Sequence, residues 1–221
     1  MPATSDAQTF RWGAATPSAL YMGPTKVWPA APTALLSEDF SSGTWDAWTN
    51  NTAYGGTAAV VSGVGNLVRT SGAAWSMATG SCRYRALAAA DFEILFDFTK
   101  DTAWACSLGV ALRMPSNVVA GGLSVWINPD NTWQLEDGAT TRVAPVSFPQ
   151  TSGAWYRVRI RLVGSQVSGR CWTTGDAEPG TWSWTTSAAA VTAAGNLGFC
   201  NIGDSSGTRT VGLDNIIVTA P

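Results

Sequence analysis

The sequence predicts an all-β protein, and three observations support this class. Short apolar runs recur at regular intervals along residues 35–221, and Gly, Pro, Asn or Asp separates nearly every pair of them. No stretch has the apolar spacing of an amphipathic helix. The run DFEILFDF alternates with the period of a strand that has one buried face, formed by Phe92, Ile94, Phe96 and Phe98. We therefore expect an all-β sandwich or barrel.

The expected strands follow one another closely, and three pairs of them have hairpin signals. A Gly-Val-Gly turn joins AAVVSG to NLVRTS. WINPDNTWQL turns at residues 129–131, and RLVGSQVSGRCW turns at residues 164–165. The remaining expected strands lie in WSMATG, SCRYRALA, AWACSLGVALRM, TRVAPVSF, TWSWTTSA, NLGFCNIG and VGLDNIIVTA.

Residues 1–34 differ from the rest and are predicted to form an N-terminal arm and linker. The apolar pieces ALYM and KVW flank a Gly-Pro turn, which predicts a small hairpin, and PAAP favours a stiff, extended linker. A segment this small cannot bury Trp12, Tyr21 and Trp28 by itself. We expect these side chains to attach the arm to a partner or to a neighbouring subunit. Packing against its own domain is the alternative.

Composition excludes several functions. The formal net charge is −2 and only 13% of residues are charged, so no nucleic-acid partner is expected. The absence of histidine removes the commonest general base and metal ligand. The N-terminus lacks the pattern of a secretory signal, and no apolar run is long enough to predict membrane insertion.

The cysteines lie far apart and form no CxxC pair, so a zinc site is not expected. We interpret them as small buried apolar residues, with one or two disulfides as the alternative. The four are Cys82, Cys106, Cys171 and Cys200.

Four pieces in order resemble one known group of folds. They are EDFSSGTWDAW near the start of the domain, WYRVRIRLVGSQVSGRCW, DAEPGTWSWTT and a final LDNIIV. Together they resemble concanavalin A-like lectin/glucanase jelly rolls, including laminin G-like domains, over residues 35–221. The resemblance implies two antiparallel sheets with the first and last strands side by side. It also implies a concave face, which holds sugar in many members.

The arm has a resemblance of its own. ATPSALYMGPTKVWPA resembles a short module at the start of many minor tail and other virion proteins of bacteriophages that infect actinobacteria. This implies a virion protein assembled in the host cytoplasm, held by other virion proteins through its arm. We also expect it to be a homo-oligomer.

The resemblance raises the question of an enzyme, because glucanases of this group use two carboxylates on one strand. Glu93 and Asp97 are the nearest match, but a central acid is missing, and this spacing on a strand separates them by about 13 Å. We therefore expect no hydrolysis. If their strand lies near WYRVRIRL, these acids face Arg157, Arg159 and Arg161 in a charge ladder on the wet side of the sheet.

Sugar binding needs an aromatic platform and polar groups beside it. Three sets of residues qualify, although core packing is the commoner fate of any single tryptophan. They are Trp126 with Asn128 and Asp130, Trp133 with Gln134, and Trp172 with Trp182 and Trp184, the last two expected on one strand face.

A structural calcium ion is a further option that the resemblance implies. Sandwiches of this group often bind calcium where the first and last strands meet, through oxygen ligands. Glu38, Asp39 and Asp214 lie in the corresponding positions.

The sequence as a whole predicts a non-enzymatic phage virion protein, either a minor tail or a capsid-surface component, that displays a lectin-like domain for adhesion to host cell-wall glycans. Two alternatives stay open. One is a purely architectural capsid decoration protein that binds no sugar, and the other is a glycoside hydrolase.

Overall fold

The computed structural model describes residues 20–22, 25–28, 34–101, 105–115, 122–138, 140–187, 191–204 and 207–221. The chain divides into two units, Met1–Thr33 and Ala34–Pro221. In the first unit, β1 (Leu20–Met22) and β2 (Thr25–Trp28) pair antiparallel, as the sequence predicts. Among the predicted attachment residues, Tyr21 and Trp28 belong to these two strands, and Trp12 lies outside the described residues.

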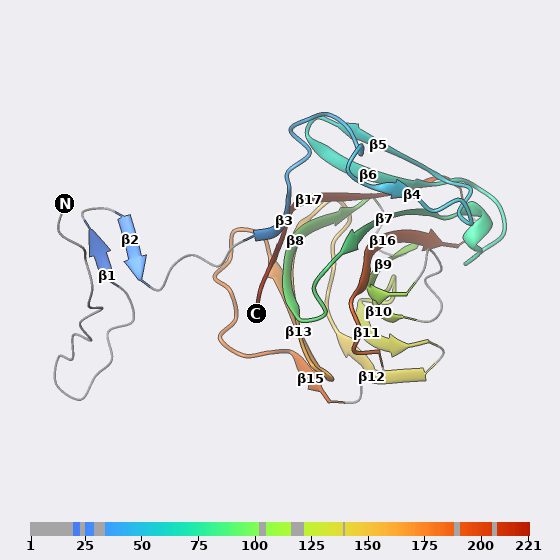
Figure 1. Ribbon diagram of the computed structural model, residues 1–221. Helices are drawn as coiled ribbons and strands as arrows, with labels where there is room; N and C mark the ends of the chain where they lie inside the picture. Colours follow the sequence, from blue (N-terminus) through green and yellow to red (C-terminus); the bar gives the residue numbers. More distant parts are fainter. Residues whose placement is uncertain are drawn as a thin grey trace. The chain divides into compact units, whose positions relative to one another are not determined.

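The second unit is a sandwich of two antiparallel sheets, which confirms the predicted fold class (Figure 1). The strand order in the seven-stranded sheet is β12 (Thr140–Ser147), β11 (Thr132–Asp137), β10 (Leu123–Ile127), β9 (Cys106–Met114), β16 (Gly195–Gly203), β7 (Ser81–Leu87) and β4 (Thr49–Asn50). The order in the eight-stranded sheet is β15 (Trp184–Thr186), β14 (Gln166–Thr173), β13 (Trp155–Val163), β8 (Phe92–Lys100), β17 (Arg209–Thr219), β6 (Val64–Arg69) and β5 (Thr57–Val61), with β3 (Ala34–Glu38) paired to β17.

Local sequence explains these connections. The predicted hairpins are present as β10–β11 and β13–β14, and β5–β6 turns at Ser62 and Gly63, which both have positive φ. β3 and the last strand, β17, lie side by side, as the resemblance implied. The strand expected in WSMATG is wrong, because this segment forms a loop and the 3-10 turn η1 (Met77–Thr79) between β6 and β7. No helix in the described parts of the chain is long and apolar enough to cross a membrane.

The core lies between the two sheets and follows the period-2 pattern of the strands. The even-numbered residues of DFEILFDF are fully or almost fully buried, as predicted. Aromatic contacts then connect the sheets, for example between Phe96 and Phe199, whose ring centroids are 5.1 Å apart. All four cysteines are free thiols; Cys171 is half-buried and the other three are buried, which agrees with their interpretation as small apolar residues.

Candidate functional site

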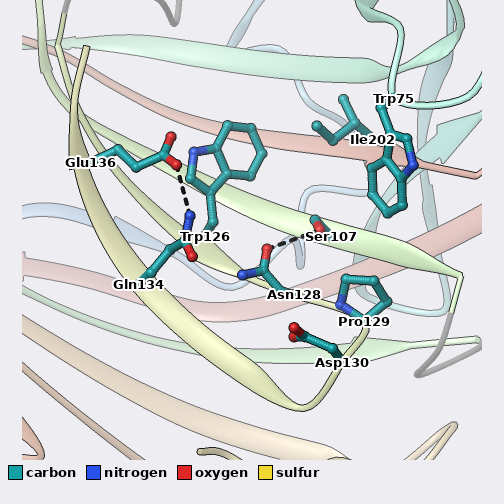
Figure 2. A pocket seen from close by; sticks show the side chains of 9 residues that line it. All are labelled: Trp75, Ser107, Trp126, Asn128, Pro129, Asp130, Gln134, Glu136 and Ile202. Carbon is teal, nitrogen blue, oxygen red and sulfur yellow. Dashed lines mark hydrogen bonds between the residues drawn. The ribbon is translucent and has the colours of Figure 1, made fainter. Parts of the chain in front are cut away.

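A hollow of about 430 Å³ lies on the outer face of the seven-stranded sheet, the face turned away from the core. Strands β9, β10, β11 and β16 supply its base, and the loop between β6 and β7 supplies one wall. The residues that line it are Trp75, Ser107, Trp126, Asn128, Pro129, Asp130, Gln134, Glu136 and Ile202 (Figure 2).

Strand alternation places Trp126 on this outer face. Its neighbours Val125 and Ile127 are buried in the core, so the indole must point the other way. Gly109 lies directly beside it on β9, and a Cβ there would stand 2.5 Å from Cζ3 of the indole. The absence of a side chain at Gly109 therefore lets the indole lie against the sheet.

Trp75 forms the opposite wall and is 48% exposed. Its φ of 55° is in the left-handed region, which is costly for a bulky side chain. A hydrogen bond of 2.6 Å from its backbone N–H to the carbonyl of Gly203 holds this conformation. In Figure 2 the two indoles lie on either side of Ser107. Backbone strain that keeps a large apolar group in water is typical of a binding site.

The polar groups of the hollow are fixed by one another. Ser107 Oγ donates to Asn128 Oδ1 at 3.3 Å, and Gln134 Nε2 donates to Glu136 Oε1 at 2.7 Å. Asp130 accepts a 2.6 Å hydrogen bond from the hydroxyl of Thr132. Among the described residues of the lining, the charged side chains are Asp130 and Glu136, both acidic, and they stand beside amides and a hydroxyl. Such a set suits a ligand rich in hydroxyl groups.

A buried ammonium supports this base from within the sandwich. Lys100 is 3% exposed, and its Nζ donates to the carbonyls of Asn128 and Cys106, each at 3.2 Å. Burial lowers the pKa of Lys100 to about 8. The raised pKa of the Cys106 thiol, about 11, has the same cause. Lys100 thus ties β8 to the turn that carries Asn128.

The structure brings together one of the three predicted sets, Trp126 with Asn128 and Asp130, and adds Gln134 from the second. Prediction missed Trp75, Ser107, Glu136 and Ile202. Trp75 was missed because its segment, WSMATG, was expected to form a strand, whereas the structure has a loop and a 3-10 turn there.

The other predicted tryptophans do not belong to the hollow. Assignment of Trp133 and Trp184 to a glycan platform is wrong, because both are buried in the core with ring centroids 5.1 Å apart. Trp172 is also buried, at 9% exposure, and is paired in register with Arg157. Trp182 does not share a strand face with Trp184, since β15 begins only at residue 184.

The predicted charge ladder is present in part on the outer face of the eight-stranded sheet, where Arg157 and Arg159 pair with acids of β8 and Arg161 is exposed. β8 and β13 are neighbours, with Asp97 opposite Arg157. Arg157 donates two hydrogen bonds to Asp97, at 2.6 and 2.7 Å, and Arg159 forms an ion pair with Glu93. Arg159 forms a second ion pair with Glu178, which prediction did not include; its Nε lies 2.6 Å from Glu178 Oε1. The acids once considered for hydrolysis are thus engaged by arginines.

The loop after β14 folds onto this ladder. Arg170 forms an ion pair with Glu178 and donates to the carbonyl of Pro179 at 2.8 Å. Its guanidinium also lies over the Trp182 ring, 4.4 Å from the centroid. This places Trp182 in a structural cation-π contact.

The residues of the predicted calcium site do not fit a metal ion as they are arranged. Glu38 accepts from the backbone N–H of Phe40 at 2.9 Å and from the Trp48 indole at 3.3 Å, so both its oxygens are engaged. Asp39 accepts from the N–H of Ser41. Burial raises the pKa of Asp214. The described residues contain no group of three acidic, cysteine or histidine side chains that could hold a metal.

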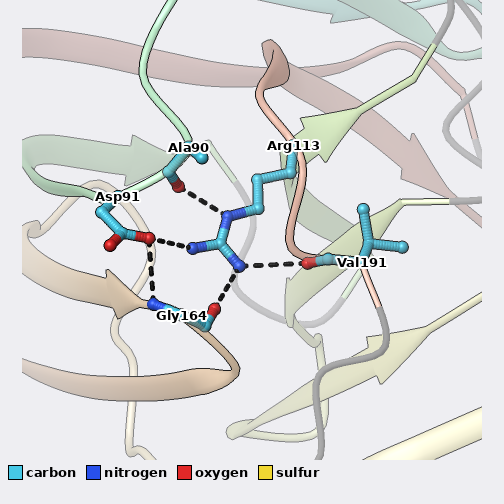
Figure 3. Close-up of polar contacts among 5 residues, drawn as sticks. All are labelled: Ala90, Asp91, Arg113, Gly164 and Val191. Atoms are coloured by element: carbon cyan, nitrogen blue, oxygen red, sulfur yellow. Dashed lines mark hydrogen bonds and ion pairs between the residues drawn. The ribbon is translucent and has the colours of Figure 1, made fainter.

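A second buried cation, Arg113, is structural. Figure 3 shows its guanidinium among three loops, donating to the carbonyls of Ala90, Gly164 and Val191 at 2.6 to 3.0 Å and to Asp91 at 3.0 Å. Burial lowers the pKa of Arg113. Because its donors are directed at protein acceptors, this cation clamps loops and offers no site for an anion.

Comparison with known proteins gives structural matches alone. No family model matches the sequence, and no curated protein matches it. The carbohydrate binding module CBM66 from Bacillus subtilis matches with a TM-score of 0.57 and 13% identity, over 79% of this chain and 96% of that one. The CBM2 module of the evolved Dit of Lactobacillus casei BL23 phage J-1 matches with a TM-score of 0.60 and 14% identity, over 84% and 94%.

An enzyme has the same architecture. A prokaryotic β-1,3-1,4-glucanase (lichenase) derived from a mouse hindgut metagenome matches with a TM-score of 0.60 and 9% identity, over 84% of this chain and 98% of that one. At such low identity these likenesses concern the fold. The second unit of this chain therefore has the concanavalin A-like lectin/glucanase jelly-roll fold.

Proposed function

We propose that this domain binds carbohydrate without cleaving it, in the hollow between Trp75 and Trp126. The observation that carries the proposal is the exposed indole of Trp75, held in a costly conformation across a polar base from a second indole. An indole packs against the apolar face of a pyranose ring, and nearby amides and carboxylates bind its hydroxyl groups.

The charges of the hollow narrow the ligand class. Asp130 and Glu136 line it, whereas no arginine or lysine does among the described residues. A uronic acid or a phosphate-bearing glycan would meet like charge there. We therefore propose a neutral or amino-bearing saccharide.

Hydrolysis is not part of the proposal. Asp97 is 3% exposed and accepts hydrogen bonds from Arg157 and Asn215, which supports a structural role. Glu93 is bound to Arg159 on the same face. Both belong to the eight-stranded sheet, and the hollow lies on the seven-stranded one.

We further propose that the chain is a bacteriophage virion component, attached through residues 1–34 and using the jelly roll for adhesion to host cell-wall glycans. Two likenesses support this: the arm module and the match to a module of a phage Dit. Many copies on one particle would make weak binding effective. If the arm attaches the chain, residues 9–30 are buried against another subunit in an intact particle, and a solvent-exposed arm there contradicts attachment.

A glycan array tests the binding proposal directly. The wild-type domain should bind a set of neutral or amino sugars, and Trp126→Ala should weaken that binding by about 30-fold, the loss of a central contact residue. Trp182→Ala is the matched control, because it removes a tryptophan outside the hollow. Equal losses in both variants, or no glycan bound by the wild type, contradict the proposal and favour an architectural role. Release of reducing ends from a bound glycan favours a hydrolase.

A further inference from the structure

Two thiols lie directly opposite each other on neighbouring strands. Cys82 on β7 is in register with Cys200 on β16, and both side chains are fully buried. They belong to a small apolar cluster that also contains Tyr54 and is separate from the main core.

The backbone hydrogen bonds reveal which kind of strand pair this is. The carbonyl of Cys82 accepts a 3.1 Å bond from the N–H of Asn51, on the side away from β16. In a strand, the N–H and C=O of one residue point to the same side, so Cys82 makes no ladder bond with Cys200. Such non-hydrogen-bonded pairs have Cα atoms about 4.5 Å apart. That separation lies within the range of about 4.4 to 6.8 Å found for disulfides.

The surroundings keep the Cys200 thiol protonated in the reduced pair. Burial and the neighbouring Cys82 raise the pKa of Cys200 well above that of an ordinary thiol, and burial likewise raises the pKa of Tyr54. The segment that contains Asn51 and Tyr54 covers both sulfurs, so a reagent reaches neither of them while it is closed. Thiolate is the reactive form, so the raised pKa slows Cys200 further. Local opening of that segment, beside the two-residue edge strand β4, gives access.

We propose that Cys82 and Cys200 are a dithiol site that a small-molecule disulfide oxidises to a cross-strand disulfide. One thiolate attacks the small disulfide and releases a thiol, and the other then attacks the mixed disulfide and releases the second thiol. The two protein thiols lose two electrons and two protons, which the two released thiols carry away. This inference is independent of the proposed function.

The disulfide would lie in the same cross-strand row as the hollow. Cys200 is in register with Gly109, and Gly109 with Trp126. The bond would also join two strands that are distant in the chain, which restricts the unfolded state and raises stability. Oxidation therefore locks the sheet on which Trp126 lies.

The test uses the full chain, incubated with oxidised glutathione at mildly alkaline pH, then acid-quenched, unfolded and alkylated. Mass spectrometry should find two of the four cysteines alkylated and a peptide of Cys82 joined to one of Cys200. Mild denaturant should accelerate the reaction. Four alkylated cysteines, a bond that involves Cys106 or Cys171, or a bond between chains would overturn the proposal.

Thermal unfolding supplies an independent measurement. The oxidised wild type should melt roughly 5 to 10 °C above the reduced protein. Cys106→Ala is the matched control and should keep this difference, whereas Cys200→Ala should lose it. An equal midpoint for oxidised and reduced wild type would contradict a cross-strand bond that locks the sheet.

Discussion

The two outer faces of the sandwich use similar residue types in opposite ways. On the eight-stranded sheet, Arg159 and Arg170 bind Glu178, and Trp182 lies under a guanidinium. On the seven-stranded sheet, Trp75 is 48% exposed beside a hollow with a polar base. One face pairs Arg157, Arg159, Arg170 and Trp182 with other groups of the chain, and the other leaves an indole in water.

This difference separates stability from recognition. Ion pairs and a cation-π contact make the first face a support for a loop, because Glu178 and Trp182 of that loop bind arginines of the sheet. A strained backbone that presents an indole costs stability, and a ligand that packs on the indole offsets that cost. Substitutions on the two faces should therefore change different measurements.

The largest effect is expected for Asp97→Ala on the ladder. This removes two hydrogen bonds from Arg157 and one from Asn215, and leaves a partly buried guanidinium unpaired. The free energy of unfolding should fall by about 2.5 kcal/mol, less than for a fully buried pair. Denaturant unfolding measures it, and glycan affinity of the folded variant should stay unchanged. A loss of affinity would break the separation of the two faces.

Charge reversal should have a smaller effect on the same face. Arg159→Glu brings a third carboxylate beside Glu93 and Glu178 and should cost about 1.5 kcal/mol. Adding Glu93→Arg should recover about half of this, because Glu178 stays opposed. Asp97→Arg is the control that should not rescue, since Asp97 pairs with Arg157. Rescue by that control would contradict the pairing described.

On the outer face of the seven-stranded sheet, Gly109→Ala should change glycan binding more than stability. The new Cβ would stand 2.5 Å from the Trp126 ring and push the indole off the sheet. Glycan affinity should fall about tenfold, which is about 1.4 kcal/mol of binding free energy. The free energy of unfolding should change by less. Titration calorimetry measures the affinity. Gly138→Ala, at a turn outside the hollow, is the control and should leave the affinity unchanged.

The smallest effect comes from the ammonium beneath the hollow. The folded pKa of Lys100, about 8, lies below the unfolded value of about 10.4, so the unfolded chain binds more protons between these values. Stability from this group therefore rises with pH, by about 1 kcal/mol from pH 8 to pH 9. A thiol with a raised pKa, such as Cys106, has the opposite effect, because its contribution to stability falls as pH rises. The difference between wild type and Lys100→Met isolates the effect, and parallel pH curves would contradict it.

Much of the fold could be predicted because alternation and turn residues fix it locally. The side chains of Phe92, Ile94, Phe96 and Phe98 point inward because every second residue of a strand faces the core. The residues Pro129, Asp130 and Asn131 favour the turn between β10 and β11. The charge ladder was predictable because two alternating strands had complementary charges. Glu178 was not, since a loop reaches the ladder only through tertiary structure.

The site was predicted in part for a related reason. Strand alternation predicts that Trp126 and Trp133 lie on opposite faces of a hairpin, but it does not predict which of the two faces packs against the second sheet. Trp184 looked like Trp182 because the strand was expected to begin earlier than it does. A strand was expected to begin at Trp75, but the residue lies in a loop, and its position depends on a hydrogen bond to Gly203, distant in sequence.

The central claim is that a saccharide binds between two particular indoles. NMR spectra of the indole N–H groups, recorded while the strongest array ligand is titrated, test this most directly. The account predicts that signals of Trp75 and Trp126 shift with one shared dissociation constant, while those of Trp182 and the buried Trp133 stay in place. Shifts confined to Trp182 or Trp172, or bound glycan without any shift at Trp75 and Trp126, would contradict it.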